Sequence, residues 1–220
     1  MRAGQTLVAR DGYEVALFPL VALYDYQDEG GTGSHEGTYN IDFHGYSFNL
    51  ATHTWVREYD APIYAPCKCK LVYKYPSGTV GGNGRTFQSV NKVYTPGGLR
   101  YIMFYFGHDE NPVANTINQV FLQGQLIAHT GNYGVSTGDH THSCMGEGQW
   151  VNWNTSMTTR PSGHQDFTNH IHYWDAVYVN GTEILQGRGH SWQIWEEPPF
   201  IPATTRGKFP WVLYANKLRS

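Results

Sequence analysis

The sequence predicts a mainly β protein, with an antiparallel sheet, an open groove walled by long loops, and few short helices. The 220 residues include 25 Gly and 16 Tyr, and only 15% are charged, a composition typical of a turn-rich β protein with aromatic side chains along a groove. No stretch of fifteen residues has a strong helical period. The apolar runs are short and are bounded by glycine, proline and other turn residues, as strands are.

The first element is an apolar segment at 13–24 that contains Pro19. Because proline cannot donate a ladder hydrogen bond, an edge strand or extended arm is favoured here over a helix. Residues 28–35 are rich in Gly, Ser and Thr and predict a loop that leads to His35. Strand-like segments then follow at 39–50, 63–75, 85–94, 101–106 and 123–128.

Turns and connectors separate these strands. A hairpin at 94–101 turns on Pro96–Gly98, and residues 112–122 predict a short connector or helix. The polar run 154–169 predicts a loop or insertion. Residues 169–182 predict a strand or short connector and then a further strand.

Composition also limits the partners. A net charge of −3 argues against nucleic acid, whose phosphates require clustered Lys and Arg. No apolar run approaches the roughly 18–20 residues of a membrane span, and no signal peptide is recognised because charged residues interrupt the N-terminal segment. The three cysteines, Cys67, Cys69 and Cys144, are expected to be buried free thiols, since their number is odd and they include no Cys-x-x-Cys pair. Oligomeric state is left open.

The most informative segment is the glycine-punctuated loop 131–142, which runs into His140-x-His142. On a strand, residues two apart share a face and lie about 6.5–7 Å from each other. One imidazole could therefore hold a metal ion while the other acts on a water molecule beside it. A His-x-His pair alone is weak support, because strand histidines are often only half-buried polar residues.

Three further segments strengthen this interpretation. His35 and Asp42 supply an imidazole and a carboxylate with six residues between them. Residues 61–72 form a proline-bounded turn into a strand. Residues 101–108 form an apolar strand that ends in Gly107-His108.

In this order, the four segments resemble the lysostaphin/LytM-type zinc metallopeptidases, which cut peptidoglycan. That family has an early His…Asp, a P-V-Y-A-P-x-x-G-x-V strand, a strand ending in Y-G-H, and the sequence G-N-T-G-x-S-T-G-P-H-L-H. The resemblance covers about 18–150. The six-residue spacer after His35 departs from the usual His-x-x-x-Asp and looks like the phage-borne branch of tail-knob peptidases and endolysins. Asp139 stands where the family most often has Pro, and we interpret it as a solvated loop residue rather than one that tunes His140.

The resemblance implies the roles of five residues. His35, Asp42 and His142 would bind Zn²⁺, leaving a position open for water. His108 and His140 would be the catalytic residues beside it. His140 is the better candidate for the general base, although the two roles could be exchanged.

The implied function is zinc-dependent endopeptidase action on bacterial peptidoglycan, in a stem peptide or a cross-bridge. The enzyme would act on the cell wall and be delivered by a phage, either through holin pores as an endolysin or on a tail tip. The alternative is a non-catalytic wall-binding or virion structural module on the same fold. The expected domain spans 1–195, with extra strands at about 170–195, and 196–220 forms a Pro-rich arm or linker.

The other histidines receive lesser roles. His44 could share the strand face of Asp42 and support the site. A second pair, His170-x-His172, is a rival site that lacks the Gly-rich lead-in. Surface or loop positions without a functional role are expected for His53, His129, His164 and His190. Groove-lining aromatic residues could include Tyr39, Tyr133 and Trp150.

Overall fold

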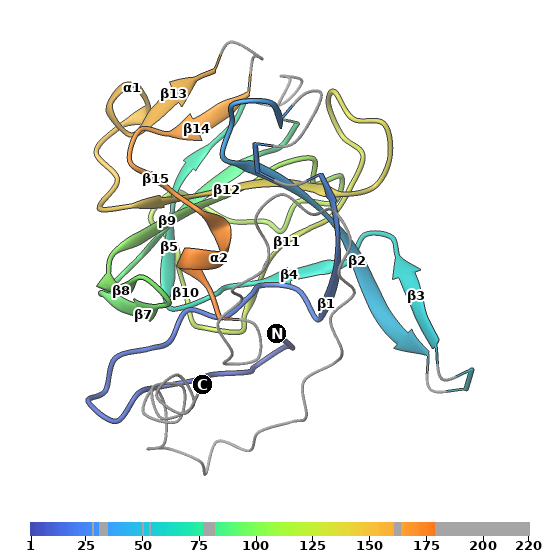
Figure 1. The fold of residues 1–220 in the computed structure, drawn as a ribbon, viewed down its shortest axis with the longest axis horizontal. Coiled ribbons are helices and arrows are strands. Elements are labelled where there is room, and N and C mark those ends of the chain that lie inside the picture. Colours follow the sequence, from blue (N-terminus) through green and yellow to red (C-terminus); the bar gives the residue numbers. More distant parts are fainter. Residues whose placement is uncertain are drawn as a thin grey trace.

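The computed structural model describes residues 1–27, 29–30, 35–49, 51–52, 54–76, 82–160 and 164–178. Within these residues it contains fifteen strands and two four-residue helices, so the mainly β prediction is confirmed (Figure 1). The strands and helices in chain order are β1 (Ala22–Gln27), β2 (Asn40–Asn49), β3 (Thr54–Glu58), β4 (Pro62–Tyr64), β5 (Cys69–Lys74), β6 (Arg85–Ser89), β7 (Val93–Thr95), β8 (Gly98–Arg100), β9 (Ile102–Phe106), β10 (Val120–Phe121), β11 (Leu126–His129), β12 (Thr141–Glu147), α1 (Trp153–Ser156), β13 (Met157–Thr159), β14 (Gln165–Phe167), β15 (His170–Ile171) and α2 (Tyr173–Ala176).

One nine-stranded antiparallel sheet dominates the fold. Its main path runs β1-β2-β12-β9-β6-β5-β10, with β3 added to β2 and β15 added to β12. The strand that carries His142 therefore pairs with β2, β9 and β15. Every residue of β9 is buried, which is why this strand is almost continuously apolar rather than alternating.

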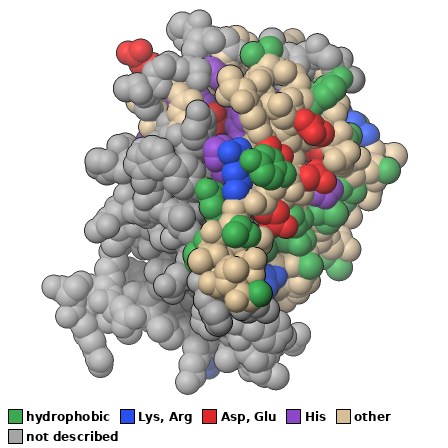
Figure 2. All heavy atoms as spheres, turned by 90° about the vertical axis from the view of Figure 1, so that its right-hand side faces the viewer, with side chains coloured by type: hydrophobic (Ala, Val, Ile, Leu, Met, Phe, Trp, Pro, Cys, Tyr) green, Lys and Arg blue, Asp and Glu red, His purple; other side chains and the backbone are tan. Residues whose placement is uncertain are grey.

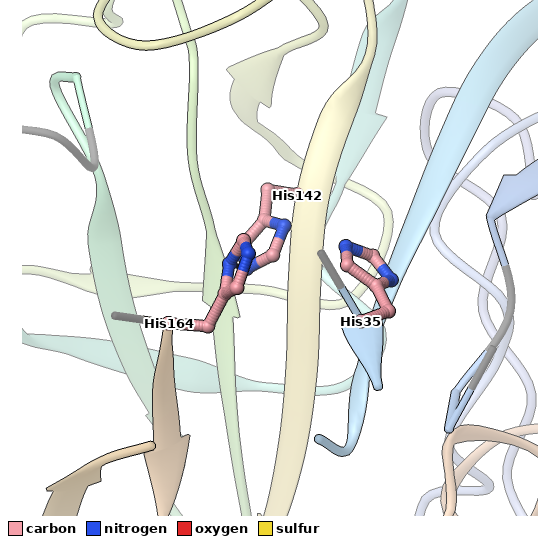
Figure 3. Close-up of side chains that lie close together, drawn as sticks. All are labelled: His35, His142 and His164. Atoms are coloured by element: carbon pink, nitrogen blue, oxygen red, sulfur yellow. The ribbon is translucent and has the colours of Figure 1, made fainter. Parts of the chain in front are cut away.

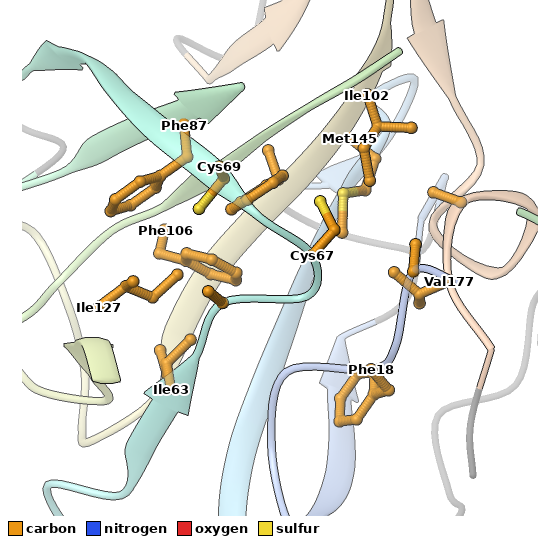
Figure 4. Close-up of a cluster of buried hydrophobic side chains, with 14 of the residues drawn as sticks. Phe18, Ile63, Cys67, Cys69, Phe87, Ile102, Phe106, Ile127, Met145 and Val177 are labelled. Carbon is orange, nitrogen blue, oxygen red and sulfur yellow. The ribbon is translucent and has the colours of Figure 1, made fainter. Parts of the chain in front are cut away.

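The main core packs against this sheet (Figure 4). Phe87 of β6 and Phe104 of β9 stack with ring centroids 5.5 Å apart, and both are fully buried. Burying each such ring contributes about 1.5–3 kcal/mol to folding. The three cysteines are buried free thiols, as predicted, and burial raises the pKa of each.

Several predicted elements are confirmed in detail. The segment at 13–20 is an extended, mostly buried arm, and its last part leads into β1. Strands β7 and β8 form the predicted hairpin, in which Thr95 opposes Gly98. Of the two possibilities for 112–122, the structure has a connector, which ends in the short strand β10.

The segment predicted as a loop or insertion has more structure than expected. Asn152 caps α1, because its side-chain oxygen accepts a hydrogen bond from Thr155 N. Strands β13 and β14 then form a hairpin. Buried Asp166 ties this hairpin to the sheet, accepting hydrogen bonds from Tyr39 N and Asn40 Nδ2 at 3.0 and 3.1 Å.

The C-terminal predictions lie mostly outside the described residues. Strand β15 and helix α2 occupy part of 169–182. The expected strands beyond 178 and the Pro-rich arm at 196–220 fall on residues that the structure does not describe. In the described part of the chain, no helix is long and apolar enough to cross a membrane.

Candidate metal centre

The centre of the site is a pair of residues on adjacent strands. In the antiparallel ladder of β2 and β12, Asp42 lies directly opposite His142, although 100 positions separate them in the sequence. The Nδ1–H group of His142 donates to Asp42 Oδ1 at 2.9 Å. This hydrogen bond joins two interior strands of the large sheet, whose backbones are both fixed by further neighbouring strands.

His35 approaches the same carboxylate from a tight turn before β2. Thr38 closes that turn, since its backbone N and its Oγ1 both donate to the His35 carbonyl oxygen at 3.0 Å. The fully buried His35 ring has Nε2 3.4 Å from Asp42 Oδ2. Neither ring nitrogen of His35 has a hydrogen-bond partner in the part of the chain that the structure describes.

A metal ion bound to the His35 ring would supply the partner that its nitrogens lack. A buried polar atom without a partner costs about 1–3 kcal/mol, so native proteins rarely leave one without a purpose. Two imidazoles and a carboxylate are a donor set that Zn²⁺ accepts, and catalytic zinc sites have three protein ligands. His35, Asp42 and His142 fit this requirement.

The protonation states also suit a cation. Burial would raise the pKa of Asp42, but its contacts with His142 and His35 outweigh burial and hold that pKa well below its ordinary value. Burial lowers the pKa of His142 to about 4, although Asp42 acts in the opposite direction. At neutral pH the site therefore presents an ionised carboxylate and a neutral imidazole, the forms that bind metals.

His140 and His108 lie beside this group, with ring centroids 4.6 Å apart. Each ring is oriented by a backbone carbonyl: His140 Nδ1 donates to Gly138 O at 2.7 Å, and His108 Nδ1 donates to Tyr133 O at 2.8 Å. A ring that donates from Nδ1 in its neutral form has its lone pair on Nε2. His140 Nε2 lies 3.6 Å from Asp42 Oδ2, so this lone pair faces the site.

The backbone of His108 has an uncommon conformation. Its φ of +69° is in the left-handed region, which non-glycine residues rarely adopt. Buried Asp109 holds the segment, since its carboxylate accepts hydrogen bonds from Asn111 N and His129 N at 2.9 and 3.2 Å. Gly131 packs so closely that a Cβ atom there would lie 2.3 Å from His108 O.

All five residues proposed from the sequence thus come together. The sequence missed a sixth, His164, for which a surface or loop position without a role was predicted. His164 does lie in a loop, just before β14, and is half-buried, but it is not remote from the site, because His164 Nδ1 lies 3.2 Å from His142 Nε2. One ligand atom from each of His35, His142 and His164 lies within 4.8 Å of the other two (Figure 3). No motif surrounds His164, so no sequence signal could have identified it.

The remaining histidines are divided between the site's surroundings and other regions. His44 is buried, its ring centroid is 6.5 Å from that of His140, and burial lowers its pKa to about 4. His129 is half-buried beside Asp109 rather than on the surface. His53 and His190 lie outside the described residues.

The rival His-x-His pair has other partners. The ring of His170 stacks on Tyr39 at 3.5 Å, and His172 Nδ1 donates to Glu29 Oε2 at 2.7 Å. Neither histidine belongs to the three-imidazole group. Of the other aromatic residues proposed for the groove, Trp150 packs near Tyr73. The groove-lining role stays a prediction.

Asp139 lies in a loop, as expected, but it is half-buried and hydrogen-bonded rather than simply solvated. Its carboxylate accepts hydrogen bonds from Thr130 Oγ1 at 2.8 Å and from Asp60 N at 3.0 Å. Its carbonyl oxygen accepts a third from Arg57 Nη2 at 2.6 Å. Asp139 therefore fastens the loop before His140 to the turn after β3. On the face drawn in Figure 2, basic side chains (blue), carboxylates (red) and histidines (purple) are interspersed.

Comparisons with known proteins give distant similarities. No protein-family profile matches the chain. Morphogenesis protein 1 of Bacillus phage B103 is 31% identical over 183 residues, which are 83% of this chain and 45% of that protein. The chain thus spans less than half of the relative's length.

Solved structures are similar at lower identity. The catalytic domain of the antimicrobial peptidase lysostaphin from Staphylococcus simulans gives a TM-score of 0.40 at 20% identity, covering 59% of this chain and 82% of that one. Pseudoalterin, an M23 metalloprotease from the deep sea, gives a TM-score of 0.39 at 15% identity, and the match covers 88% of this chain and 99% of that one. The chain is therefore similar in sequence to a phage morphogenesis protein, and its structural neighbours include lysostaphin-type metallopeptidases.

Proposed function

We propose that this chain is a zinc-dependent endopeptidase that hydrolyses peptide bonds in bacterial peptidoglycan. The observation that carries the proposal is the buried His35 ring, which lies beside the Asp42–His142 pair and whose two nitrogens lack hydrogen-bond partners in the described structure. His108 and His140 adjoin this group with oriented rings. The motif order, which resembles the lysostaphin/LytM-type peptidases, supplies the substrate class.

The chain's own residues would divide the work as follows. His35, Asp42 and His142 would hold the zinc ion, which when bound would polarise the scissile carbonyl group and lower the pKa of a water molecule toward about 7. His140 would take the proton from that water at Nε2 and pass it to the leaving amine. Its Nδ1–H stays on Gly138 O during this transfer, so the ring keeps its orientation.

His108 would stabilise the negative charge that develops on the carbonyl oxygen or orient the water. Its ring is fixed in the same way as that of His140, through an Nδ1 hydrogen bond to a backbone carbonyl oxygen. Both rings are therefore oriented alike by a backbone carbonyl, and the roles of His108 and His140 could be exchanged. Which histidine is the base is decided by the kinetics of the single variants.

The place of action is part of the proposal. Similarity to a phage morphogenesis protein supports a phage protein that reaches the wall either through holin pores or on a virion. The bond cut would be in a stem peptide or a cross-bridge. A non-catalytic virion structural or wall-binding module is the second candidate, because the name of that relative refers to assembly. The five suitably placed side chains favour the enzyme.

Metal analysis combined with wall digestion tests the proposal. The purified chain should contain about one zinc per molecule, as a single site of this type predicts. Peptides should be released from purified walls and identified by mass spectrometry. Chelation should stop their release, and added zinc should restore it. Full activity of protein shown to be metal-free would refute the enzyme assignment. Zinc binding without release from any of several wall types would favour the structural module.

A further inference from the structure

Both ring nitrogens of His142 have partners. Nδ1 faces Asp42 Oδ1 at 2.9 Å, and Nε2 faces His164 Nδ1 at 3.2 Å. The two imidazole rings lie nearly parallel, with 25° between their planes and centroids 4.7 Å apart. His164 is thus the residue that contacts His142 on the side away from the carboxylate.

The fold places His164 at this position. The His164 carbonyl oxygen accepts a hydrogen bond from Arg160 N at 2.8 Å, which joins the two ends of the β13–β14 connection. Arg160 Nε in turn donates to buried Asp166 at 2.7 Å. Asp166 is also bonded to the start of β2, the strand that carries Asp42. The hairpin that presents His164 is therefore tied to the strand that presents the proposed carboxylate ligand.

The positions of the protons on the His142 and His164 rings follow from which partner atoms can donate and which can only accept. A neutral imidazole carries one N–H group and one lone pair. Because the Asp42 carboxylate can only accept, the proton of His142 sits on Nδ1 when no metal is bound. Its Nε2 is then an acceptor, and His164 Nδ1 donates to it. Asp42, another proposed ligand, faces Nδ1 of His142, so a metal ion held by both residues would take the place of the Nδ1 proton, and the remaining N–H would then be on Nε2.

We propose that His164 is a positioning residue for His142, serving as a hydrogen-bond partner that donates in the metal-free site and accepts in the metal-bound site. This inference rests on the proposed zinc site. An imidazole suits the task because it can donate or accept at the same atom, whereas a carboxylate could only accept and an ammonium group could only donate. Ligand histidines commonly have their second ring nitrogen fixed in this way.

The proton count balances during the change. His142 would release its Nδ1 proton to solvent on binding a metal ion. It gains one on Nε2 from His164 Nδ1, and His164, which is half-buried, takes one from solvent on its own Nε2. Both rings stay neutral throughout. The alternative is that His164 is itself a metal ligand, because one ligand atom from each of the three imidazoles lies within 4.8 Å of the other two.

Three variants separate these possibilities. His164→Leu removes the hydrogen bond, and His164→Gln keeps a side chain that can both donate and accept. His170→Gln changes a control histidine in β15, a strand that pairs with the strand of His142. Zinc affinity is measured by competition with a chromophoric chelator. The position of the His142 proton is followed by ¹⁵N NMR of the rings, and X-ray absorption of the zinc-bound protein counts imidazole ligands.

We expect His164→Leu to weaken zinc binding by about 10–100-fold, the usual effect of losing such a partner. His164→Gln should recover most of the affinity, and His170→Gln should match wild type. In wild type, the His142 proton should move from Nδ1 to Nε2 when zinc is added. The number of imidazole ligands should be two in wild type and in His164→Leu.

Three imidazoles in wild type and two in His164→Leu would overturn the inference and make His164 a ligand. If wild type binds zinc and His164→Leu binds it with unchanged affinity, the inference about His164 is overturned but the proposed function is not. Wild-type protein that binds no zinc would instead refute the proposed function together with it. If His164→Leu does not fold, the affinity of His164→Gln and the proton position in wild type still decide the matter.

Discussion

Replacing Gly131 by alanine tests how tightly the two proposed catalytic histidines are held. Gly131 pairs with His140 through two backbone hydrogen bonds of 3.0 and 2.9 Å. A Cβ atom on Gly131 would lie 2.3 Å from His108 O and 2.7 Å from Glu110 N. Both obstructing atoms belong to the backbone, so no side-chain rotation can relieve the contact.

The size of the effect follows from these distances. Ordinary contact begins at 3.4 Å, so the segment of His108 or that of His140 must retreat by about 1 Å, a displacement that can cost about 10²-fold in rate. Overpacking of this kind also costs about 1–3 kcal/mol of stability. The contacts of Gly131 described above are with His108, Glu110 and His140, none of which is a proposed ligand, so zinc should be retained.

The assay compares wall-peptide release, zinc content and thermal unfolding in Gly131→Ala and in a matched control. Gly138→Ala lies in the same loop, and its Cβ would meet only Arg57 Nη2, at 4.0 Å. The control should behave much like wild type. A Gly131→Ala protein with wild-type turnover would refute the reasoning, and loss of zinc from it would show that the two groups of histidines are not independent.

Three further predictions concern single side chains. Asp42→Ala should lower zinc affinity by orders of magnitude. Glu36 is exposed, so Glu36→Ala should leave zinc affinity nearly unchanged. Loss of zinc in the Glu36 variant alone would show that Glu36, and not Asp42, is the metal-bound carboxylate. His142→Ala should lose both zinc and turnover, but His140→Ala should keep its zinc and lose about 10²–10⁴-fold in rate, and equal zinc loss in the two would contradict the roles given. Burial raises the pKa of Glu14 above 4.5, although a hydrogen bond of 2.6 Å from Lys68 N to its Oε2 acts in the opposite direction. The folded state therefore holds the Glu14 proton more tightly than the unfolded state does. The wild-type free energy of unfolding should fall as the pH rises through the raised pKa. Glu14→Gln should remove this fall in denaturant titrations run across the pH range, and an unchanged pH profile would contradict the burial argument.

Much of the fold could be predicted because its signals are local. The Pro96–Gly98 turn, the apolar run of β9 and the absence of a helical period each depend on neighbouring residues. The insertion at 154–169 was underestimated for the opposite reason. Its order comes from Asp166, whose partners Tyr39 and Asn40 lie more than 120 positions away.

The site shows the same division. His35, Asp42, His108, His140 and His142 could be proposed because they occur in motifs whose order resembles a known family. His164 could not, since only the pairing of β13 with β14 brings it to His142. Asp139 was misinterpreted because its partners, Thr130 and the turn at Asp60, meet it only in the folded chain.

At position 108, stability and the proposed catalytic role favour different residues, because the backbone of His108 is in the left-handed region. Glycine adopts that conformation without strain, whereas an imidazole-bearing residue there costs about 1–3 kcal/mol. Selection for stability alone would therefore favour glycine over histidine at position 108. What it would select is a more stable protein without one of its two proposed catalytic groups, so any stabilising design has to keep this residue fixed and improve the chain elsewhere.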